Sequence, residues 1–219
     1  MIGTGDQRII DALYPMISAR RAARIENVIA ERTYGVSVVL ESLYDQANAA
    51  AIMRTCDGFG IQRVNLVITG PNYKCDRKVS IGAHKWLDVH RYGDATSCAR
   101  DLKAEGYTLL TTHLDESRSI EEIDFSGKVA LVFGTERDGV SDEMLALSDG
   151  NFKIPMAGFA QSFNVSVAAA VALYHAISDR RRRTGSKGDL SDLEQRTLRE
   201  RFYRRTVRAS DLLVEELRK

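Results

Sequence analysis

One stretch of the chain, Val165–Ile177, is apolar on every side of the helix it would form, and only Ser166 and His175 interrupt it. A helix of this kind belongs in the interior of a protein, and the run is too short to cross a bilayer. The loop before it, from Pro155 to Asn164, contains a glycine and several polar side chains. A polar loop at the start of a buried helix is a typical ligand site in α/β proteins.

Strand-like and helix-like segments alternate through the middle of the chain. Buried strands are predicted at residues 36–40, 63–68, 89–92, 107–112 and 128–133, with a further strand-like end just before Pro155. Helices are predicted at residues 18–33, 44–60 and 95–105, and after a cap at Ser141. We therefore expect an α/β fold in which a mainly parallel sheet carries helices on both faces.

Charge is distributed unevenly along the chain. Residues 36–175 contain 13 Lys and Arg against 18 Asp and Glu, although the whole chain has a net charge of +1. Both ends are therefore basic, which favours contact between the ends and a polyanion. Solvated helical tails would produce the same bias, so the charge by itself leaves both interpretations open.

The two ends read as helical additions to a central domain. We expect an N-terminal extension at 1–35, a central domain at 36–180, and a basic C-terminal extension at 181–219. Arginines 180–183 are interpreted as a basic linker, and Ser191 with Glu194 forms a capping-box signature. The apolar side chains predicted to dock the tail helices are Leu193, Leu198, Phe202, Leu212, Leu213 and Leu217. Exposed arginines are predicted on the tail and at Arg20, Arg21, Arg24 and Arg32.

Several classes of protein are not expected. No apolar run approaches the ~20 residues of a membrane span, and the N-terminus lacks the pattern of a signal peptide. The three cysteines, Cys56, Cys75 and Cys98, include no CxxC pair, which favours reduced thiols in the cytoplasm and no metal site. Neither GxGxxG after the first strand nor GxxxxGK[ST] is present, which argues against nicotinamide or nucleoside-triphosphate chemistry.

The first cluster of candidate functional residues combines Asn48 and Arg54. Six residues correspond to nearly 240° around a helix, so the two share a face only if the helix begins after Asn48. With Asn48 as the N-cap, both side chains would point toward the carboxyl end of the sheet. A capping asparagine and a surface arginine explain the same residues without any function.

Two further clusters follow predicted strands or precede the buried helix. Gly134 comes directly after the strand at 128–133, where a glycine lets a ligand approach the backbone, and Glu136 lies in the same turn. Gln161, Ser162 and Asn164 precede the buried helix, and they offer more polar groups than capping requires. Each cluster by itself is compatible with an ordinary turn or cap.

The order of the three clusters is more specific than any one of them. NAAAIMRTCDGFG (48–60), LVFGTERDGVS (131–141) and IPMAGFAQSFNVSVAAAVALY (154–174) resemble the three signature motifs of the SPOUT superfamily, in its TrmH branch of RNA ribose 2′-O-methyltransferases. GAHKW (82–86) is similar to the version in tRNA-directed members. The resemblance covers about residues 36–180, and the short helical ends are similar to tRNA-binding extensions.

The resemblance implies a parallel α/β sheet with a C-terminal trefoil knot, a homodimer, and S-adenosylmethionine as cofactor. The implied cofactor-binding residues are Thr112, Gly134, Glu136, Ile154, Met156, Ser162, Phe163 and Asn164. The implied catalytic residues are Arg54, Asn48, Glu136, Ser162 and Asn164. Phe163 departs from the family pattern, which usually has leucine at this position.

The implied reaction is 2′-O-methylation of the ribose of guanosine 18 in the tRNA D-loop. The implied partners are tRNA and a second copy of the chain, with no membrane and no metal, in the cytoplasm. Two alternatives remain open: a ribose 2′-O-methyltransferase acting on rRNA, and a non-catalytic RNA-binding protein of the same fold.

Overall fold

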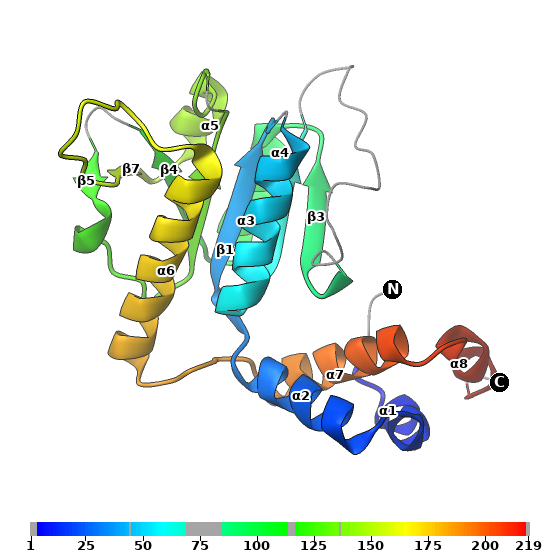
Figure 1. The fold of residues 1–219 in the computed structure, drawn as a ribbon. Coiled ribbons are helices and arrows are strands. Elements are labelled where there is room, and N and C mark those ends of the chain that lie inside the picture. The colour runs from blue at the N-terminus through cyan, green and yellow to red at the C-terminus, as the bar shows by residue number, and fades with distance from the viewer. Residues whose placement is uncertain (1–3, 44, 69–84, 114–116, 136, 218–219) are drawn as a thin grey trace. The chain divides into compact units, whose positions relative to one another are not determined.

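The structure, a computed structural model, describes residues 4–43, 45–68, 85–113, 117–135 and 137–217 (Figure 1). The chain divides into two compact units. One unit contains residues 34–186 and holds the sheet, and the other combines residues 1–33 with residues 187–219. Within the described residues, no helix is both long enough and apolar enough to cross a membrane.

The sheet has seven strands in the order β3-β2-β1-β6-β4-β7-β5. Their bounds are β1 (Thr33–Glu41), β2 (Ile61–Val67), β3 (Asp88–Tyr92), β4 (Thr108–Thr112), β5 (Arg118–Ser119), β6 (Val129–Phe133) and β7 (Gly150–Lys153). The pairs β1–β6, β2–β3, β4–β6, β4–β7 and β5–β7 are all parallel. The predicted mainly parallel sheet is confirmed, while β5 is too short to leave a pattern in the sequence.

Helices cover both faces of the sheet, as predicted. On one face lie α3 (Gln46–Phe59) and α6 (Val165–Thr184), which run side by side in Figure 1. On the other face lie α4 (Ala95–Ala104) and α5 (Asp142–Leu147). The short 3-10 helix η3 (Ile120–Glu122) packs with α6 on the first face. One side of the apolar run of α6 is buried against the sheet, but Val167, Val171 and Tyr174 are exposed, so the prediction of a helix buried on every side is wrong.

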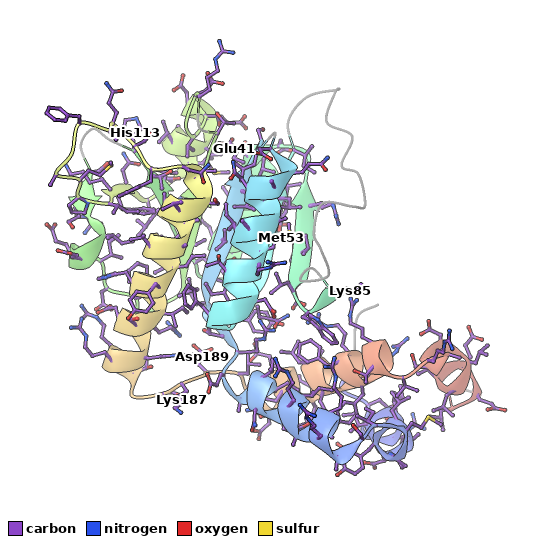
Figure 2. The ribbon with its side chains drawn as sticks, viewed as in Figure 1. Glu41, Met53, Lys85, His113, Lys187 and Asp189 are labelled. Carbon is purple, nitrogen blue, oxygen red and sulfur yellow. The ribbon has the colours of Figure 1, made fainter. Side chains whose placement is uncertain are left out.

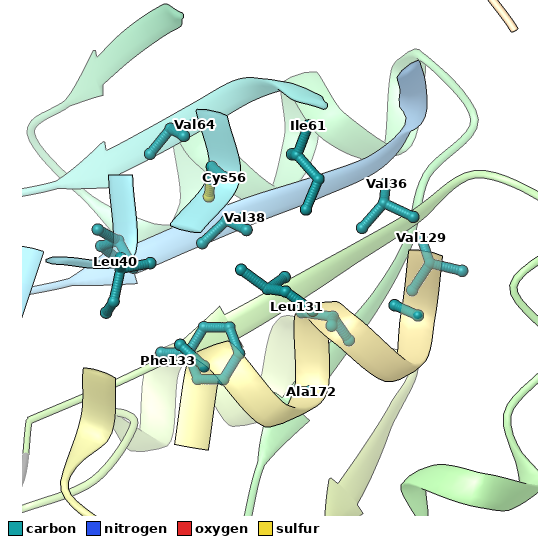
Figure 3. Close-up of a cluster of buried hydrophobic side chains, with 14 of the residues drawn as sticks. Val36, Val38, Leu40, Cys56, Ile61, Val64, Val129, Leu131, Phe133 and Ala172 are labelled. Atoms are coloured by element: carbon teal, nitrogen blue, oxygen red, sulfur yellow. The ribbon is translucent and has the colours of Figure 1, made fainter. Parts of the chain in front are cut away.

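Alternating side chains of the central strands divide between the two cores. Val38 and Leu40 of β1 pack with Leu131 of β6 and with α3 and α6 (Figure 3). Val39, between them, packs in the second core with α4 and α5. Since successive side chains of a strand point to opposite faces, a strand buried on both faces reads as a continuous apolar run.

Arg180 fastens the C-terminal part of α6 to the loop before β6. Its Nη1 donates hydrogen bonds to the carbonyl oxygens of Phe125 (2.8 Å), Ser126 (2.9 Å) and Gly127 (2.6 Å). The guanidinium lies against Gly35 of β1, where an added Cβ would stand 2.0 Å from Arg180 Cζ. Residues 180–183 therefore belong to α6, which continues to Thr184, and the predicted linker at these residues is wrong.

Gly35→Ala should lower the free energy of unfolding by about 3 kcal/mol, because displacing the guanidinium gives up charge-assisted hydrogen bonds worth about 1.5–3 kcal/mol each. Urea unfolding of the purified variant measures the change. Gly127→Ala is the control, since a Cβ there meets no atom within 4 Å although its carbonyl binds the same guanidinium. Equal stability of the two variants would contradict the prediction.

The second unit is a small helical bundle. It contains α1 (Gln7–Leu13), the 3-10 helix η1 (Tyr14–Met16), α2 (Ala19–Ala30), α7 (Asp192–Thr206) and α8 (Ser210–Leu217). The cap predicted at Ser18 and the capping box of Ser191 and Glu194 are confirmed. Packing of α7 against both α1 and α2 joins the two ends of the chain in one core.

Several residues of this bundle differ from the sequence-based prediction. Leu193, Leu212 and Leu217 are exposed, so their predicted docking is wrong, whereas the predicted docking of Leu198 and Phe202 is confirmed and Val214 joins them in the core. The arginines are not uniformly exposed either. Arg32 is 1 % exposed and stacks over the Phe202 ring at 6.0 Å, Arg199 is paired with Glu26, and Arg204 with Glu200. Helical spacing could not reveal these contacts, because long cationic side chains also pack along apolar surfaces.

Glu200 is a buried carboxylate that ties the N-terminus to α7. Its Oε2 accepts hydrogen bonds from the backbone N–H groups of Thr4 (2.8 Å), Gly5 (2.8 Å) and Asp6 (3.2 Å). Its Oε1 lies 3.3 Å from Arg204 Nη1. A buried charge is tolerated when it is paired and hydrogen-bonded in this way.

Candidate functional site

A cavity of about 500 Å³ opens at the carboxyl edge of the sheet. Its walls come from the ends of β4, β6 and β7, from the loop before α6, and from the first turn of that helix. The lining residues from the strand ends include Thr112, His113, Gly134 and Ile154. In open α/β sheets this edge is where ligands bind, and the volume is that of a small-molecule site.

Six of the predicted cofactor-binding residues line this cavity: Thr112, Gly134, Ile154, Met156, Ser162 and Phe163. They come from three segments that lie far apart in the sequence. Asn164 follows directly after this set, and it is the N-cap of α6, where its side chain accepts from the Ser166 N–H. Glu136 lies outside the described residues, so its predicted role stays a prediction.

Asn48 and Asn164, from two different motifs, are in contact. The Asn164 Nδ2 donates to the Asn48 Oδ1 at 3.3 Å, and Asn164 Oδ1 accepts from the Ser166 hydroxyl at 2.6 Å. This contact joins the N-terminal parts of α3 and α6 beside the cavity. The two amide side chains are fixed by their mutual hydrogen bond and by the bonds of Asn164 to the first turn of α6. They therefore form a preorganised polar border beside the cavity.

The expected arrangement of Asn48 and Arg54 on α3 is wrong. The N-cap of α3 is Asp45, whose side chain accepts from the Ala47 N–H at 2.7 Å, so Asn48 lies inside the helix. With both residues helical, Arg54 points about 240° away from Asn48 around the axis. Arg54 is exposed and is not among the described residues that line the cavity. Asp and Asn are equally good caps, so the sequence alone does not distinguish a helix that begins after Asp45 from one that begins after Asn48.

The loop after β6 is folded back on itself tightly. Thr135 N–H donates to the Gly139 carbonyl at 2.9 Å, and Gly139 N–H donates to the Thr135 carbonyl at 3.0 Å. A Cβ on Gly134 would stand 1.9 Å from the Gly139 oxygen. Only glycine fits at this position, which explains why a glycine follows the buried strand.

Six polar residues that were not predicted as ligand contacts also line the cavity: His113, Thr135, Arg137, Asp138, Asp142 and Lys153. His113 follows β4 at the carboxyl edge of the sheet (Figure 2), Arg137 and Asp138 belong to the loop after β6, and Lys153 ends β7. The common signal of these four in the sequence is their place at or just after the end of a parallel strand. That signal becomes useful only when the strand order is known.

Neither metal nor thiol chemistry is indicated by the described residues. Among them, no group of three or more His, Cys, Asp or Glu is arranged to hold a metal ion. Cys56 and Cys98 are buried free thiols, and burial raises the pKa of Cys98 to about 12. A thiol with such a pKa stays protonated and unreactive at neutral pH.

Three known proteins are similar to this chain in sequence or in fold. The chain is 34% identical over 200 residues to a tRNA (guanosine(18)-2′-O)-methyltransferase of Borreliella burgdorferi, covering 91% of each chain. A crystal structure of the A. aeolicus TrmH/SpoU tRNA modifying enzyme is similar at 29% identity and a TM-score of 0.76, covering 86% of this chain and 98% of that one. The AviRb SpoU methyltransferase of Streptomyces viridochromogenes, solved in complex with AdoMet, is similar at 26% identity and a TM-score of 0.58, over 73% of this chain and 62% of that one.

A family model gives the same assignment. Residues 35–174, which include all three motifs and the whole cavity lining, match the model of the SpoU rRNA Methylase family. This match covers more than half of the chain, and the Borreliella relative is aligned over nearly its whole length. The chain therefore belongs to the SpoU methylase family.

Proposed function

We propose that the protein transfers a methyl group from S-adenosylmethionine to the ribose 2′-hydroxyl of guanosine 18 in the tRNA D-loop. The single observation that carries the proposal is the convergence of the second and third motifs on one cavity, with the first motif joined to its border by the Asn48–Asn164 contact. The names of the Borreliella and A. aeolicus relatives support tRNA as the substrate. We propose that the unit at residues 34–186 is the methyltransferase domain and that residues 1–33 and 187–219 are its helical extensions, a few residues from the boundaries 36–180 expected from the sequence.

The cavity fits the proposed cofactor. Apolar side chains such as Phe133, Phe152 and Ile154 form one part of its lining, and polar groups such as Ser162 form another. The close approach of the backbone at Gly134 leaves main-chain groups accessible to a ligand where a side chain would block them. The AdoMet complex of AviRb, a relative of the same family, supports this choice.

The chemistry requires mainly positioning. The bound cofactor supplies an electrophilic sulfonium methyl group, and the protein must hold a ribose oxygen in line with it. Asn48 and Asn164 would orient the ribose from the border of the cavity. Arg54 would donate hydrogen bonds to the ribose oxygen as it loses its proton, or to the adjoining phosphate. We assign it no role as a base, because arginine stays protonated in proteins. As the methyl group moves from sulfur to oxygen and S-adenosylhomocysteine is released, the hydroxyl proton would pass to solvent water.

The protein would act as a homodimer, in which the partner completes each site. Three apolar side chains on one stripe of α6 are exposed in the single chain: Val167 (47 %), Val171 (42 %) and Tyr174 (63 %). The neighbouring α3 exposes small residues, Ala47 and Ala51, together with Arg54. A second copy packed on this surface would bury the stripe. It would also bring its own Arg54 toward the cavity of the first chain, which Arg54 of that chain does not line.

Two finer points accompany the proposal. The C-terminal part of the sheet unit would be tied into a trefoil knot, as the resemblance of the three motifs implies. The enzyme would work in the cytoplasm, where tRNA is available. A chain trace from a crystal structure at high resolution would test the knot, and a path that does not thread through itself would contradict it.

The basic helical unit is proposed to bind the tRNA backbone through the exposed arginines of α2. The triple replacement of Arg20, Arg21 and Arg24 by glutamine should weaken tRNA binding. It should also reduce the slope of log K against log salt by about 2–3, since each lost phosphate contact contributes roughly 0.7–0.9. Binding titrations between low and moderate salt measure both quantities.

Substitution is a better test here than removal of the C-terminal helices, because α7 supplies core residues of this bundle. The control is Arg100→Gln, an exposed arginine on α4 whose side chain is 70% accessible. An unchanged salt slope in the folded triple variant would contradict the role of α2.

The test of the function as a whole is methylation of an unmodified tRNA transcript with labelled S-adenosylmethionine, followed by mapping of the modified nucleotide. We expect one 2′-O-methylated ribose, at guanosine 18. A transcript that carries a 2′-deoxyribose at this position should accept no label. Methylation at another nucleotide, or label in the deoxy transcript, would contradict the proposal.

The family name refers to rRNA, so rRNA is the second candidate substrate. Offering both RNAs in one reaction at equal concentration separates the two by their rates. A non-catalytic RNA-binding role would appear as tRNA binding without binding of S-adenosylhomocysteine, which calorimetry measures directly.

A further inference from the structure

Glu41 is a buried carboxylate at the end of β1, and none of the predicted motifs includes it. Glu41 is 3 % exposed. Its strand β1 lies next to β6, and the loop after β6 forms part of the cavity wall. Figure 2 shows it at the same edge of the sheet as His113. Glu41 is not among the described residues that line the cavity, but it bonds to Ser141, which stands between the lining residues Val140 and Asp142.

Both carboxylate oxygens of Glu41 accept hydrogen bonds from one residue, Ser141. The Ser141 N–H donates to Oε2 at 2.9 Å, and the Ser141 hydroxyl donates to Oε1 at 2.6 Å. The same hydroxyl accepts from the Met144 N–H at 3.2 Å and so caps α5. Hydrogen bonds to a charged acceptor are about twice as strong as neutral ones, so this contact fixes the position of Ser141.

Ser141 closes a loop that forms much of the cavity wall. The loop begins at Gly134, where β6 ends, and the wall continues after it into α5 at Asp142 and Leu145. The Thr135–Gly139 hydrogen bonds hold the middle of the loop together. Its beginning is fixed by the sheet, and its end is held by Glu41 from the neighbouring strand.

We propose that Glu41 is a positioning residue for the cofactor: through Ser141 it holds the loop after β6 in the shape that binds S-adenosylmethionine. A carboxylate at this depth is costly to bury unless it is hydrogen-bonded, and here both of its oxygens bond to the residue that ends the loop. The cofactor requires the cavity wall in one arrangement. Loss of the Glu41 contact would release the end of the loop at Ser141, and this would lower the affinity for the cofactor although Glu41 itself does not line the cavity. This inference rests on the function proposed above.

The test measures S-adenosylhomocysteine binding by calorimetry, which needs no methyl transfer. Glu41→Gln keeps the size of the side chain and one acceptor oxygen but loses the charge and one acceptor. We expect its dissociation constant to rise about tenfold, with one ligand still bound per folded site. The turnover number at saturating cofactor should change much less, which separates positioning from catalysis.

Glu200→Gln is the matched control. Glu200 is likewise a buried carboxylate that accepts backbone N–H groups, but it lies in the helical bundle and not in the sheet unit. Its replacement should lower the melting temperature and leave the S-adenosylhomocysteine affinity unchanged. A general loss of stability would weaken binding in both variants alike, and that result would overturn the proposal.

The pathway through Ser141 is tested by a double-mutant cycle. Ser141→Ala removes the hydroxyl contact from an exposed residue, so it serves as the second variant if Glu41→Gln does not fold. If Glu41 acts through Ser141, the effects of the two substitutions should not add, because the residues are in contact. The dissociation constant of the double variant should then be less than twice that of whichever single variant has the higher dissociation constant. Fully additive effects would overturn the proposal.

Two outcomes remain distinct. If the unmodified protein fails to bind S-adenosylhomocysteine, the proposed function itself is contradicted. If it binds normally and Glu41→Gln binds equally well, only the role of Glu41 is contradicted.

Discussion

Arg54→Ala should reduce methyl transfer to tRNA by at least about 10²–10³-fold, which is the typical effect of removing one donor to a developing oxyanion. The affinity for S-adenosylhomocysteine should stay within twofold of the original, because Arg54 is not among the described residues lining the cavity. Single-turnover transfer of labelled methyl to tRNA, paired with calorimetry, measures the two quantities separately. A large loss of activity with unchanged binding is the signature of a group that acts on the reacting ribose.

Two further variants sharpen this test. Arg100→Ala removes an exposed arginine from α4, on the opposite face of the sheet, and it should leave both quantities unchanged. Arg54→Lys keeps the charge but not the planar pair of donors, and it should recover only a small part of the activity. Retained turnover in Arg54→Ala would exclude a role for this arginine in the reaction.

Gly134→Ala should abolish cofactor binding, with an increase in the dissociation constant of more than about 100-fold. The added Cβ would stand 1.9 Å from the Gly139 oxygen and 2.4 Å from the Val140 nitrogen, and both are backbone atoms. Backbone cannot move aside as a flexible side chain can, so the loop must open and the cavity wall must change shape. A displacement of about 1 Å at a site can already cost 10²-fold in rate. Calorimetry with S-adenosylhomocysteine measures the loss.

Gly93→Ala is the matched control for this substitution. Gly93 follows β3 directly, as Gly134 follows β6, but a Cβ there meets no atom within 4 Å. It should bind the cofactor normally and keep its melting temperature. If Gly134→Ala is folded and binds S-adenosylhomocysteine with unchanged affinity, the cofactor does not occupy this cavity.

The two inactive variants together test the shared site of the proposed homodimer. A mixture of Arg54→Ala and Gly134→Ala chains, unfolded and refolded together, would contain dimers of one chain of each kind. If Arg54 acts on the cavity of the partner, one site of such a dimer has an intact cavity and an intact arginine. Activity should then return to about a quarter of the original, the share expected for random pairing with one working site in two. No recovery would show that Arg54 serves the cavity of its own chain.

The elements that the sequence predicted well are those whose signals are local. Ser18, Ser141 and Ser191 cap helices as expected, since a capping side chain bonds to the backbone two or three residues away. The strand at 128–133 was recognised because burial on both faces leaves an unbroken apolar run. The start of α3 was missed because Asp45 and Asn48 are both acceptable caps, and only the packing of the helix selects between them.

The residues whose roles were misjudged depend on contacts between distant parts of the chain. Arg180 and Arg32 read as surface charges, yet one binds the carbonyls before β6 and the other stacks on Phe202. Glu41 gave no signal, because its partner Ser141 lies 100 residues away. Interactions at that separation leave no period in a single sequence.

The sequence by itself determined the class of fold, the order of its longer strands and helices in the central domain, and, through the resemblance of three motifs, the family and its chemistry. The tertiary structure decided which residues share the cavity, that Asn48 reaches Asn164, and that Arg54 faces away from the site in its own chain. The physical reason is that propensity, capping and apolar periodicity act within a few residues. A binding site instead requires strand ends that become neighbours only when the order β1-β6-β4-β7 is formed.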